Sequence, residues 1–347
     1  MKKLLCAMLA VLMSLLVCSC GNGAAASEGK PSAAPNPAPE EPAEKPVEIS
    51  IGHIYAPTHA IGQACDLFVQ KVNELSGGSI KAVVYPSSQL GSESEMVEQG
   101  ALDMTISGGG MYAGYNPAAA IFESLCMFTT AEQQKQIIDD MGGLDFFNEV
   151  MADSNFVAVG WMSGGARNVL SNKPIRTVED FKGFNIRVPD NKVYVDIFNA
   201  LGCNPTIVAW SEGYTAMQTG MVSGIEAGTE TLATANLQEV SKYYTITGHI
   251  NVTNFCSMNQ DVWNNLSAGQ KEAVLAAMKE ANDFQRELSE ENEQVYQELF
   301  TDSGIEIIHL SDSDMTALQQ AVSGLVIETA EEYGYADRVG ELRSCLG

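Results

Sequence analysis

The sequence is constrained most by an alternation of strand-like and helix-like segments that occurs twice along the chain. In the first set, helical periodicity at 60–75 and 93–99 separates strand patterns at 48–53, 80–85 and 102–107. In the second set, strands are expected at 156–161, 184–188, 204–208 and 223–226, and helices at 193–201 and 212–219. Because strands that are joined through helices pair in parallel, each set predicts one α/β unit. The expected fold class is α/β with two lobes.

The remaining segments predict how the two lobes are joined. They are a strand at 252–258, a long helix at 268–300, a strand at 305–308 and a last helix at 312–333. A helix of that length spans about 50 Å, which is more than one lobe needs, so we expect it to bridge both lobes. The expected boundaries are 48–164 with about 253–290 for lobe I, and 165–252 with about 291–347 for lobe II.

The charge of the chain excludes two classes of partner. Among 347 residues, 44 are acidic and 19 are basic, which gives a formal net charge of -25. A nucleic-acid-binding protein normally carries a basic face, so we expect no nucleic-acid partner. Attraction to anionic lipid headgroups is excluded for the same reason.

The first 20 residues have the pattern of a secretory signal. Lys2 and Lys3 precede an apolar stretch at 4–17, which is too short to span a membrane stably. The stretch ends in Val17-Cys18-Ser19-Cys20, which resembles a bacterial lipobox with Cys20 as the lipid acceptor. The alternative is an ordinary cleaved signal with incidental cysteines. Residues 21–47 hold six prolines and predict a semi-extended tether. We therefore expect a lipoprotein that is anchored to the cell membrane and displayed outside it.

The cysteines and histidines give no pattern of a metal site. Five cysteines remain after the signal and the lipobox, at widely spaced positions: Cys65, Cys126, Cys203, Cys256 and Cys345. Mostly buried free thiols are favoured over one or two disulfides. The four histidines lack ligand spacing, so no metal and no cofactor are expected.

No catalytic motif is present in the sequence. A cell-surface hydrolase would need a nucleophile, a base and an orienting group, which the sequence does not show. The glycines at 108–110 allow two interpretations. They could form a phosphate cradle, or they could allow a close approach of the backbone to a ligand or a tight turn, which is the favoured interpretation.

Two arginines are the most informative candidates for a binding site. The chain has only six arginines, and Arg167 and Arg187 lie at the ends of expected strands, where ligands bind in open α/β sheets. A guanidinium group on a rigid strand end suits bidentate recognition of a carboxylate. A structural salt bridge to one of the many acids is the alternative. The neighbouring strand ends add Tyr55, Ser107, Gly108, Asp190, Asn191, Trp210 and Ala227 as candidate ligand-binding residues.

Several motifs in register resemble one family. The motifs are Tyr85-Pro86-Ser87-Ser88-Gln89-Leu90-Gly91, Phe184-Asn185-Ile186-Arg187-Val188-Pro189, Leu201-Gly202-Cys203-Asn204-Pro205-Thr206 and Trp210-Ser211-Glu212-Gly213-Tyr214. Over about residues 48–340 the chain is similar to the solute-binding proteins of tripartite ATP-independent periplasmic (TRAP) transporters, of the DctP-like family. The resemblance implies a two-lobe extracytoplasmic receptor that closes on an organic acid, delivers it to the permease subunits and performs no chemistry.

The same resemblance implies roles for individual residues. Arg187 matches the arginine that pairs with the ligand carboxylate, Arg167 matches a second arginine near it, and Trp210 stands where phenylalanine is common. Ala227 departs from the family's asparagine, and Gly108 departs from a polar pocket residue. These departures suggest a bulkier or less hydroxylated acid. A binding lipoprotein of an ATP-driven importer, or a sensor component, is the alternative, and a purely structural lipoprotein would not need the arginine pair.

Overall fold

The computed structural model describes residues 45–123, 130–322 and 324–344, and the signal, Cys20 and nearly all of the expected tether lie outside them. Lobe I contains β1 (Val47–Gly52), β2 (Ile80–Tyr85) and β3 (Met104–Gly108), with β1 paired in parallel to the other two. Two long strands, β9 (Asn251–Asn259) and β4 (Phe156–Ser171), extend this sheet in antiparallel pairing. The parallel βαβαβ unit that the sequence predicts is therefore present.

Lobe II repeats the parallel arrangement. The strand β5 (Asn185–Val188) lies between β6 (Asn204–Ile207) and β7 (Gly224–Gly228) and is parallel to both. The strands β8 (Tyr243–Ile246) and β10 (Glu306–His309) pair in parallel beside the end of β4. The sequence analysis did not include β8.

The helices of the two halves lie mostly where the periodicity places them. In lobe I these are α1 (Ala60–Leu75) and α2 (Glu93–Glu98), and in lobe II they are α5 (Lys192–Ala200) and α6 (Gly213–Gln218). A further helix in lobe II, α7 (Thr229–Thr234), was not predicted. The start of α1 is set by His59, whose ring accepts a hydrogen bond from the backbone of Ile61. The helix ends before Gly77 and Gly78, which have positive φ angles that residues with a side chain rarely adopt.

Strand β4 differs most from its prediction. The expected strand ends at 161, but β4 is 16 residues long and continues to Ser171. Its pairing with β9 shifts register between Ser163 and Ala166, at Gly164 and Gly165. The glycines therefore form an irregularity within a strand, because pairing on both sides overrides their local preference for a loop. Arg167 lies on this strand, opposite Gly228 of β7.

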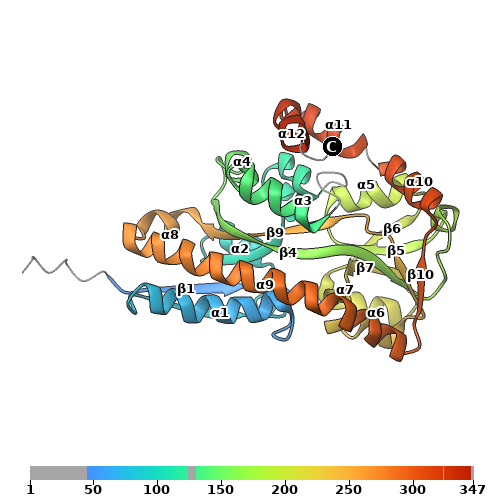
Figure 1. The fold of residues 1–347 in the computed structure, drawn as a ribbon, viewed down its shortest axis with the longest axis horizontal. Coiled ribbons are helices and arrows are strands. Elements are labelled where there is room, and N and C mark those ends of the chain that lie inside the picture. The colour runs from blue at the N-terminus through green and yellow to red at the C-terminus, as the bar shows by residue number, and fades with distance from the viewer. Residues whose placement is uncertain (1–44, 124–129, 323, 345–347) are drawn as a thin grey trace, which may run out of the picture. The chain divides into compact units, whose positions relative to one another are not determined.

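The long helix α9 (Ala268–Asp302) runs along both lobes in Figure 1, as predicted. It begins with a capping box in which Ser267 and Gln270 satisfy each other's backbone N–H groups. It packs against α1 in lobe I and against α7 and β10 in lobe II. Helix is present in the described parts of the segment where a second long helix was expected, 312–333: they are α10 (Asp312–Val322) and α11 (Gly324–Glu332), and residue 323 between them lies outside the described residues. The chain continues with α12 (Ala336–Arg343).

The segment between β3 and β4, for which no elements were predicted, contains short helices. They are η1 (Gly109–Gly114), η2 (Pro117–Glu123), α3 (Ala131–Lys135), the π-helical turn η3 (Gln136–Asp140) and α4 (Gly143–Val150). Further short elements are η4 (Val178–Phe181), η5 (Trp210–Glu212), η6 (Leu237–Val240) and α8 (Gln260–Asn265).

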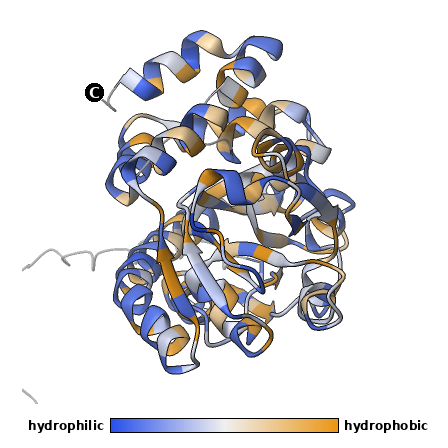
Figure 2. Cartoon of the chain, turned by 90° about the vertical axis from the view of Figure 1, so that its right-hand side faces the viewer, coloured by the Kyte–Doolittle hydropathy of each residue, from blue (hydrophilic) through white to orange (hydrophobic). Residues whose placement is uncertain are grey.

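The buried apolar residues form separate cores in the two lobes. One lobe I core contains Phe68 of α1 with Met278 of α9, and the other contains Phe122 and Phe147. Two further cores in lobe II form around β5, α5, β7 and α7. Figure 2 shows hydrophobic residues on strands and inner helix faces, with hydrophilic residues over much of the outside. The predicted lobe boundaries stay a prediction, and Val339 of α12 packs in a lobe I core although it was assigned to lobe II.

Candidate ligand-binding site

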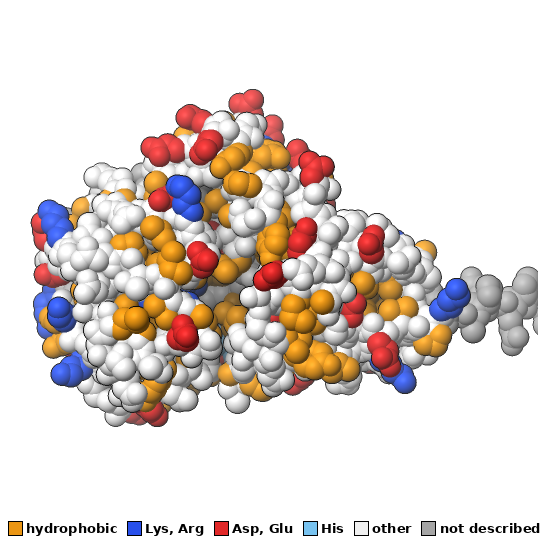
Figure 3. Space-filling view, turned by 180° about the vertical axis from the view of Figure 1, so that it is seen from behind, with side chains coloured by type: hydrophobic (Ala, Val, Ile, Leu, Met, Phe, Trp, Pro, Cys, Tyr) orange, Lys and Arg blue, Asp and Glu red, His pale blue; other side chains and the backbone are white. Residues whose placement is uncertain are grey.

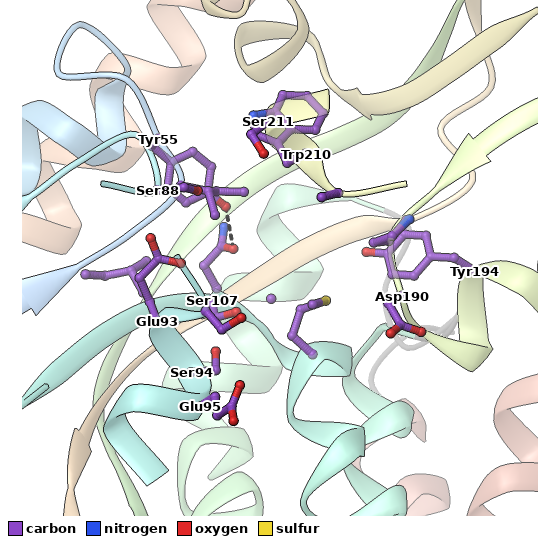
Figure 4. Close-up of a pocket in the computed structure, with 18 of the residues that line it drawn as sticks. Tyr55, Ser88, Glu93, Ser94, Glu95, Ser107, Asp190, Tyr194, Trp210 and Ser211 are labelled. Atoms are coloured by element: carbon purple, nitrogen blue, oxygen red, sulfur yellow. Dashed lines mark hydrogen bonds between the residues drawn. The ribbon is translucent and has the colours of Figure 1, made fainter. Parts of the chain in front are cut away.

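A cavity of about 720 Å³ lies between residues of lobe I and residues of lobe II. Of the predicted ligand-binding residues, it is lined by Tyr55, Ser107, Gly108, Arg167, Arg187, Asp190 and Trp210. In Figure 4, Tyr55, Ser88, Glu93 and Ser107 surround one side of the cavity, and Asp190 and Tyr194 approach from the other. The face in Figure 3 is hollowed near its centre and carries more Asp and Glu than Lys and Arg.

Arg187 is a buried cation without an acidic partner in the described part of the chain. It lies on β5, is 3% exposed, and its Nε donates a hydrogen bond of 2.8 Å to the carbonyl oxygen of Val208. The centre of the guanidinium group lies 5.4 Å from the centroid of the Trp210 ring. Burial and the nearby charge of Arg167 lower the pKa of Arg187 to about 10, against the opposing charge of Glu226. The group therefore stays protonated at neutral pH.

Arg167 differs from Arg187 because it is already paired. Its Nε and Nη2 both donate to the carboxylate of Glu226, with 2.8 Å between Nη2 and Oε1, and Nη2 also donates to the Glu226 carbonyl at 2.9 Å. Burial alone would lower the pKa of Arg167, but the charge and hydrogen bonds of Glu226, together with Tyr194 and Glu123, raise it. In this structure Arg167 therefore forms the structural salt bridge that the sequence analysis gave as the alternative to carboxylate recognition.

Glu226 is fully buried and also contacts His249, whose Nε2 lies 3.2 Å from Glu226 Oε2. Burial alone would raise the pKa of Glu226, but the Arg167 charge and the His249 hydrogen bond lower it. Burial lowers the pKa of His249, whose Nδ1 lies 2.8 Å from Thr247 Oγ1. The sequence analysis missed this network. The only signal for this network in the sequence was Glu226, an acidic residue within the strand expected at 223–226.

Two tyrosine hydroxyl groups beside the cavity are held by buried acceptors. Tyr55 donates to Asn254 Oδ1 at 2.7 Å, and Tyr194 donates to Glu123 Oε2 at 2.6 Å. Burial raises the pKa of Tyr55, and it also raises the pKa of Glu123. Asn254, Tyr194 and Glu123 were not among the predicted site residues, because these contacts join residues that are far apart in the sequence.

The glycine triplet at 108–110 leaves room for a neighbouring segment of the same chain, the end of η2. A Cβ atom on Gly108 would lie 2.4 Å from Glu123 Oε1, and one on Gly110 would lie 2.3 Å from Glu123 Cγ. A Cβ atom on Gly109 would lie 2.6 Å from Phe122 Cβ. These distances are too short for any side chain, so the triplet allows η2 to approach the end of β3. This geometry favours the close-approach interpretation over the phosphate cradle, although the close partner is the chain rather than a ligand.

Two predicted residues do not line the cavity. Asn191 caps α5, where its Oδ1 accepts a 2.8 Å hydrogen bond from the backbone of Val193. Ala227 is buried within β7, opposite Asn168 of β4, and packs in a lobe II core. Ala227 was expected in a loop, but β7 continues through it to Gly228. Pairing with β4 thus keeps this position in the sheet.

The described residues contain no group of three His, Cys, Asp or Glu side chains that could hold a metal ion. Cys65, Cys203 and Cys256 are buried free thiols, and burial raises the pKa of Cys203 to about 12. Cys126 and Cys345 lie outside the described residues. None of the helices within the described ranges is both long enough and apolar enough to cross a membrane.

Comparisons with known proteins agree on one family of binding proteins. The profile of the family described as bacterial extracellular solute-binding protein, family 7 (DctP) matches residues 51–332. The sialic acid-binding periplasmic protein SiaP of Vibrio cholerae is 27% identical, over 77% of this chain and 84% of that protein. The C4-dicarboxylate-binding periplasmic protein DctP of Rhodobacter capsulatus is 26% identical, over 84% of this chain and 88% of that protein.

A solved structure agrees with these relatives. It is a TRAP periplasmic solute-binding protein from Sulfitobacter with bound β-D-galacturonate, which is 26% identical to this chain. The TM-score is 0.79, and the match covers 85% of this chain and 99% of that chain. The two-lobe fold expected from the sequence is thus confirmed.

Proposed function

The chain belongs to family 7 of the bacterial extracellular solute-binding proteins, and we propose that it captures an organic acid between its two lobes and delivers it to the permease subunits of a TRAP transporter. Relatives named for C4-dicarboxylate, sialic acid and galacturonate support an organic acid as the class of ligand. The family is one of binding proteins, so the role proposed is recognition and transfer without chemistry.

The observation that carries this proposal is the unpaired charge of Arg187. A buried guanidinium group costs free energy unless an anion pairs with it. Among the residues that the structure describes, Glu226 already forms its ion pair with Arg167, and no ion pair reaches Arg187. A ligand carboxylate would supply the missing charge, and Trp210 would cover one face of the site. Tyr55, Ser107, Gly108, Arg167 and Asp190 are proposed as further contacts.

We also propose that the protein acts as a lipoprotein outside the cytoplasmic membrane, with Cys20 as the lipidated residue. The support is the lipobox-like sequence that ends at Cys20 and the proline-rich segment after it. An anchor and a tether would keep the receptor near the permease and leave the lobes free to move.

Thermal unfolding against a panel of acids tests the proposed ligand class. The panel contains monocarboxylic, dicarboxylic and sugar acids, each beside its uncharged amide or alcohol. An acid that binds only the folded state should raise Tm, and at 100 times Kd the stabilisation is about 2.7 kcal/mol. The matched amides should leave Tm unchanged. A rise in Tm with uncharged sugars, and with no acid, would contradict the proposal.

A further inference from the structure

A second buried ionisable side chain lines the cavity, and it belongs to lobe I, whereas Arg187 belongs to lobe II. Glu93 is the first residue of α2, and its side chain is among those at the cavity wall in Figure 4. Glu93 is 6% exposed, and its Oε1 has no hydrogen-bond partner in the described ranges. A Cβ atom on Gly52 would lie 2.8 Å from Glu93 Cγ, so the glycine on β1 leaves room for this side chain.

The surroundings of Glu93 contain no compensating cation. No ion pair in the described part of the chain includes Glu93, and the other acidic and basic side chains in the cavity wall are Glu95, Asp190, Arg167 and Arg187. Arg167 already forms an ion pair with Glu226. Burial raises the pKa of Glu93, against a hydrogen bond from its own backbone N–H group. The cavity therefore offers a free cation in lobe II and a free hydrogen-bond acceptor in lobe I.

A ligand that spans this cavity has to match both groups. Its carboxylate pairs with Arg187, and its other end reaches the wall that contains Glu93. A hydroxyl or ammonium group there would donate to the unpartnered oxygen, and an ammonium group would also pair with the ionised carboxylate. A second carboxylate there would face a like charge, which is costly in a buried site.

We propose that the ligand is a monocarboxylate with a hydrogen-bond donor at its remote end, an inference that rests on the proposed function. We also propose that Glu93 makes the site reject dicarboxylates. Glu93 is then a specificity-determining residue, whereas Arg187 supplies the affinity for the carboxylate that all candidate ligands share. The two residues lie on different lobes, so the requirement at one end of the ligand is independent of the requirement at the other.

Calorimetry with three series of unbranched acids tests this inference. The series are α,ω-dicarboxylates, ω-hydroxy acids and ω-amino acids with four to eight carbons, compared at equal length. The wild-type protein should bind the best hydroxy or amino acid at least about tenfold more tightly than the dicarboxylate of that length, which is about 1.4 kcal/mol. A preference for amino over hydroxy acids would identify the donor as ammonium, and the reverse preference would identify it as hydroxyl.

The Glu93→Gln variant tests the residue. The amide keeps the shape of the side chain, removes the charge and can donate to a carboxylate, so the preference against dicarboxylates should shrink at least about tenfold. Glu98→Gln on the same helix is the matched control. Its carboxylate contacts the backbone of Asn155 outside the cavity, and its ligand ratios should equal those of the wild type.

The outcomes separate this inference from the proposed function. Tighter binding of dicarboxylates by the wild type would overturn the inference and leave organic-acid capture standing. An unchanged ratio in a folded Glu93→Gln variant would overturn the role of Glu93. Failure of all three series and of the wider acid panel to stabilise the protein would contradict the proposed function itself. The wild-type ratios decide the ligand class even when the variant does not fold.

Discussion

Arg167 and Arg187 are buried guanidinium groups beside one cavity, but their surroundings give them different tasks. Arg167 is neutralised by Glu226, which also accepts a hydrogen bond from His249 when Nε2 carries the proton. Arg187 has a carbonyl oxygen and an aromatic ring as neighbours. The first arginine therefore holds the two strands β4 and β7 together, and the second remains available to an anion.

Removal of the Arg187 guanidinium group should abolish most of the affinity for the cognate acid. Arg187→Ala would leave the ligand carboxylate buried without its partner, at a cost of roughly 2 to 5 kcal/mol. Arg187→Lys keeps the charge but loses the planar fork, so its loss should be smaller. Calorimetry measures the affinities, and thermal unfolding of the ligand-free variants checks that they fold.

Arg176→Ala is a suitable control, because Arg176 forms an exposed ion pair with Glu306 away from the cavity. This variant should bind like the wild type. If a folded Arg187→Ala protein binds the acid as tightly as the wild type, the carboxylate is held elsewhere, and Arg167 is the first alternative.

The sequence could identify the residues at strand ends but not their partners. Arg187, Trp210 and Tyr55 follow from motif position and from the rule that ligands bind beyond the carboxyl ends of strands. The contacts of Asn254 and Tyr194, and the burial of Glu93, arise from packing between segments that are distant in the sequence. No local pattern encodes such contacts.

Three helices meet at Glu230, which connects elements of both lobes. Glu230 of α7 accepts hydrogen bonds from the backbone of Ala60 in α1 at 2.9 Å and from Asn292 of α9 at 3.0 Å. His59, at the start of α1, lies 3.1 Å from Thr231 through its Nε2. Burial and the charge of Glu293 on α9 raise the pKa of Glu230 from 4.5 to about 7, against the two hydrogen bonds.

This carboxyl group should make stability depend on pH. Because the pKa is higher in the folded protein, folding favours the protonated form, and the contribution of Glu230 to stability falls as pH rises from about 4.5 to about 7. Burial lowers the pKa of His59 to about 3, so His59 contributes in the opposite direction up to its ordinary pKa of 6.5, and the comparison of wild type with a Glu230 variant isolates the contribution of Glu230. Glu230→Gln should remove up to about 3 kcal/mol of this change in the free energy of unfolding. Urea unfolding at pH 5 and pH 7.5 measures the difference between wild type and variant.

Glu291→Gln, on the exposed side of α9, should retain the wild-type dependence on pH. Equal pH dependence in the wild-type and Glu230→Gln proteins would show that another group controls stability in this range.

Most elements could be predicted from periodicity, and the exceptions share a physical cause. The helices α1, α5 and α9 have clear helical patterns, and their ends lie within two residues of the prediction. Strand β4 was predicted too short because Gly164 and Gly165 favour a loop locally, whereas pairing with β9 and β7 keeps the chain extended. Tertiary pairing is not visible in a local sequence pattern.

At the scale of the whole molecule, ligand binding should close the two lobes. The cavity wall is divided between the lobes, so a ligand that contacts both walls favours the closed arrangement. Small-angle scattering should show a smaller radius of gyration with a saturating acid that raises Tm. The matched amide, which does not bind, is the control. An unchanged radius of gyration at saturation would count against closure.

The proposed anchor is tested by Cys20→Ser. Without a lipidated cysteine the protein has only the apolar stretch at 4–17, which is too short to span a membrane stably, so the variant should leave the membrane fraction. Fractionation of cells followed by immunoblotting measures the distribution. Cys18→Ser is the matched control and should remain with the membranes. Retention of Cys20→Ser in the membrane fraction would exclude Cys20 as the anchor.

Strand β4 belongs to the sheets of both lobes, pairing with β9 through its first part and with β7 and β8 through its last. A gene that encodes one lobe alone would therefore have to end within a strand and expose its unpaired edge. A lobe expressed alone should therefore associate with other chains through that edge, and the two lobes depend on one continuous strand for their folding.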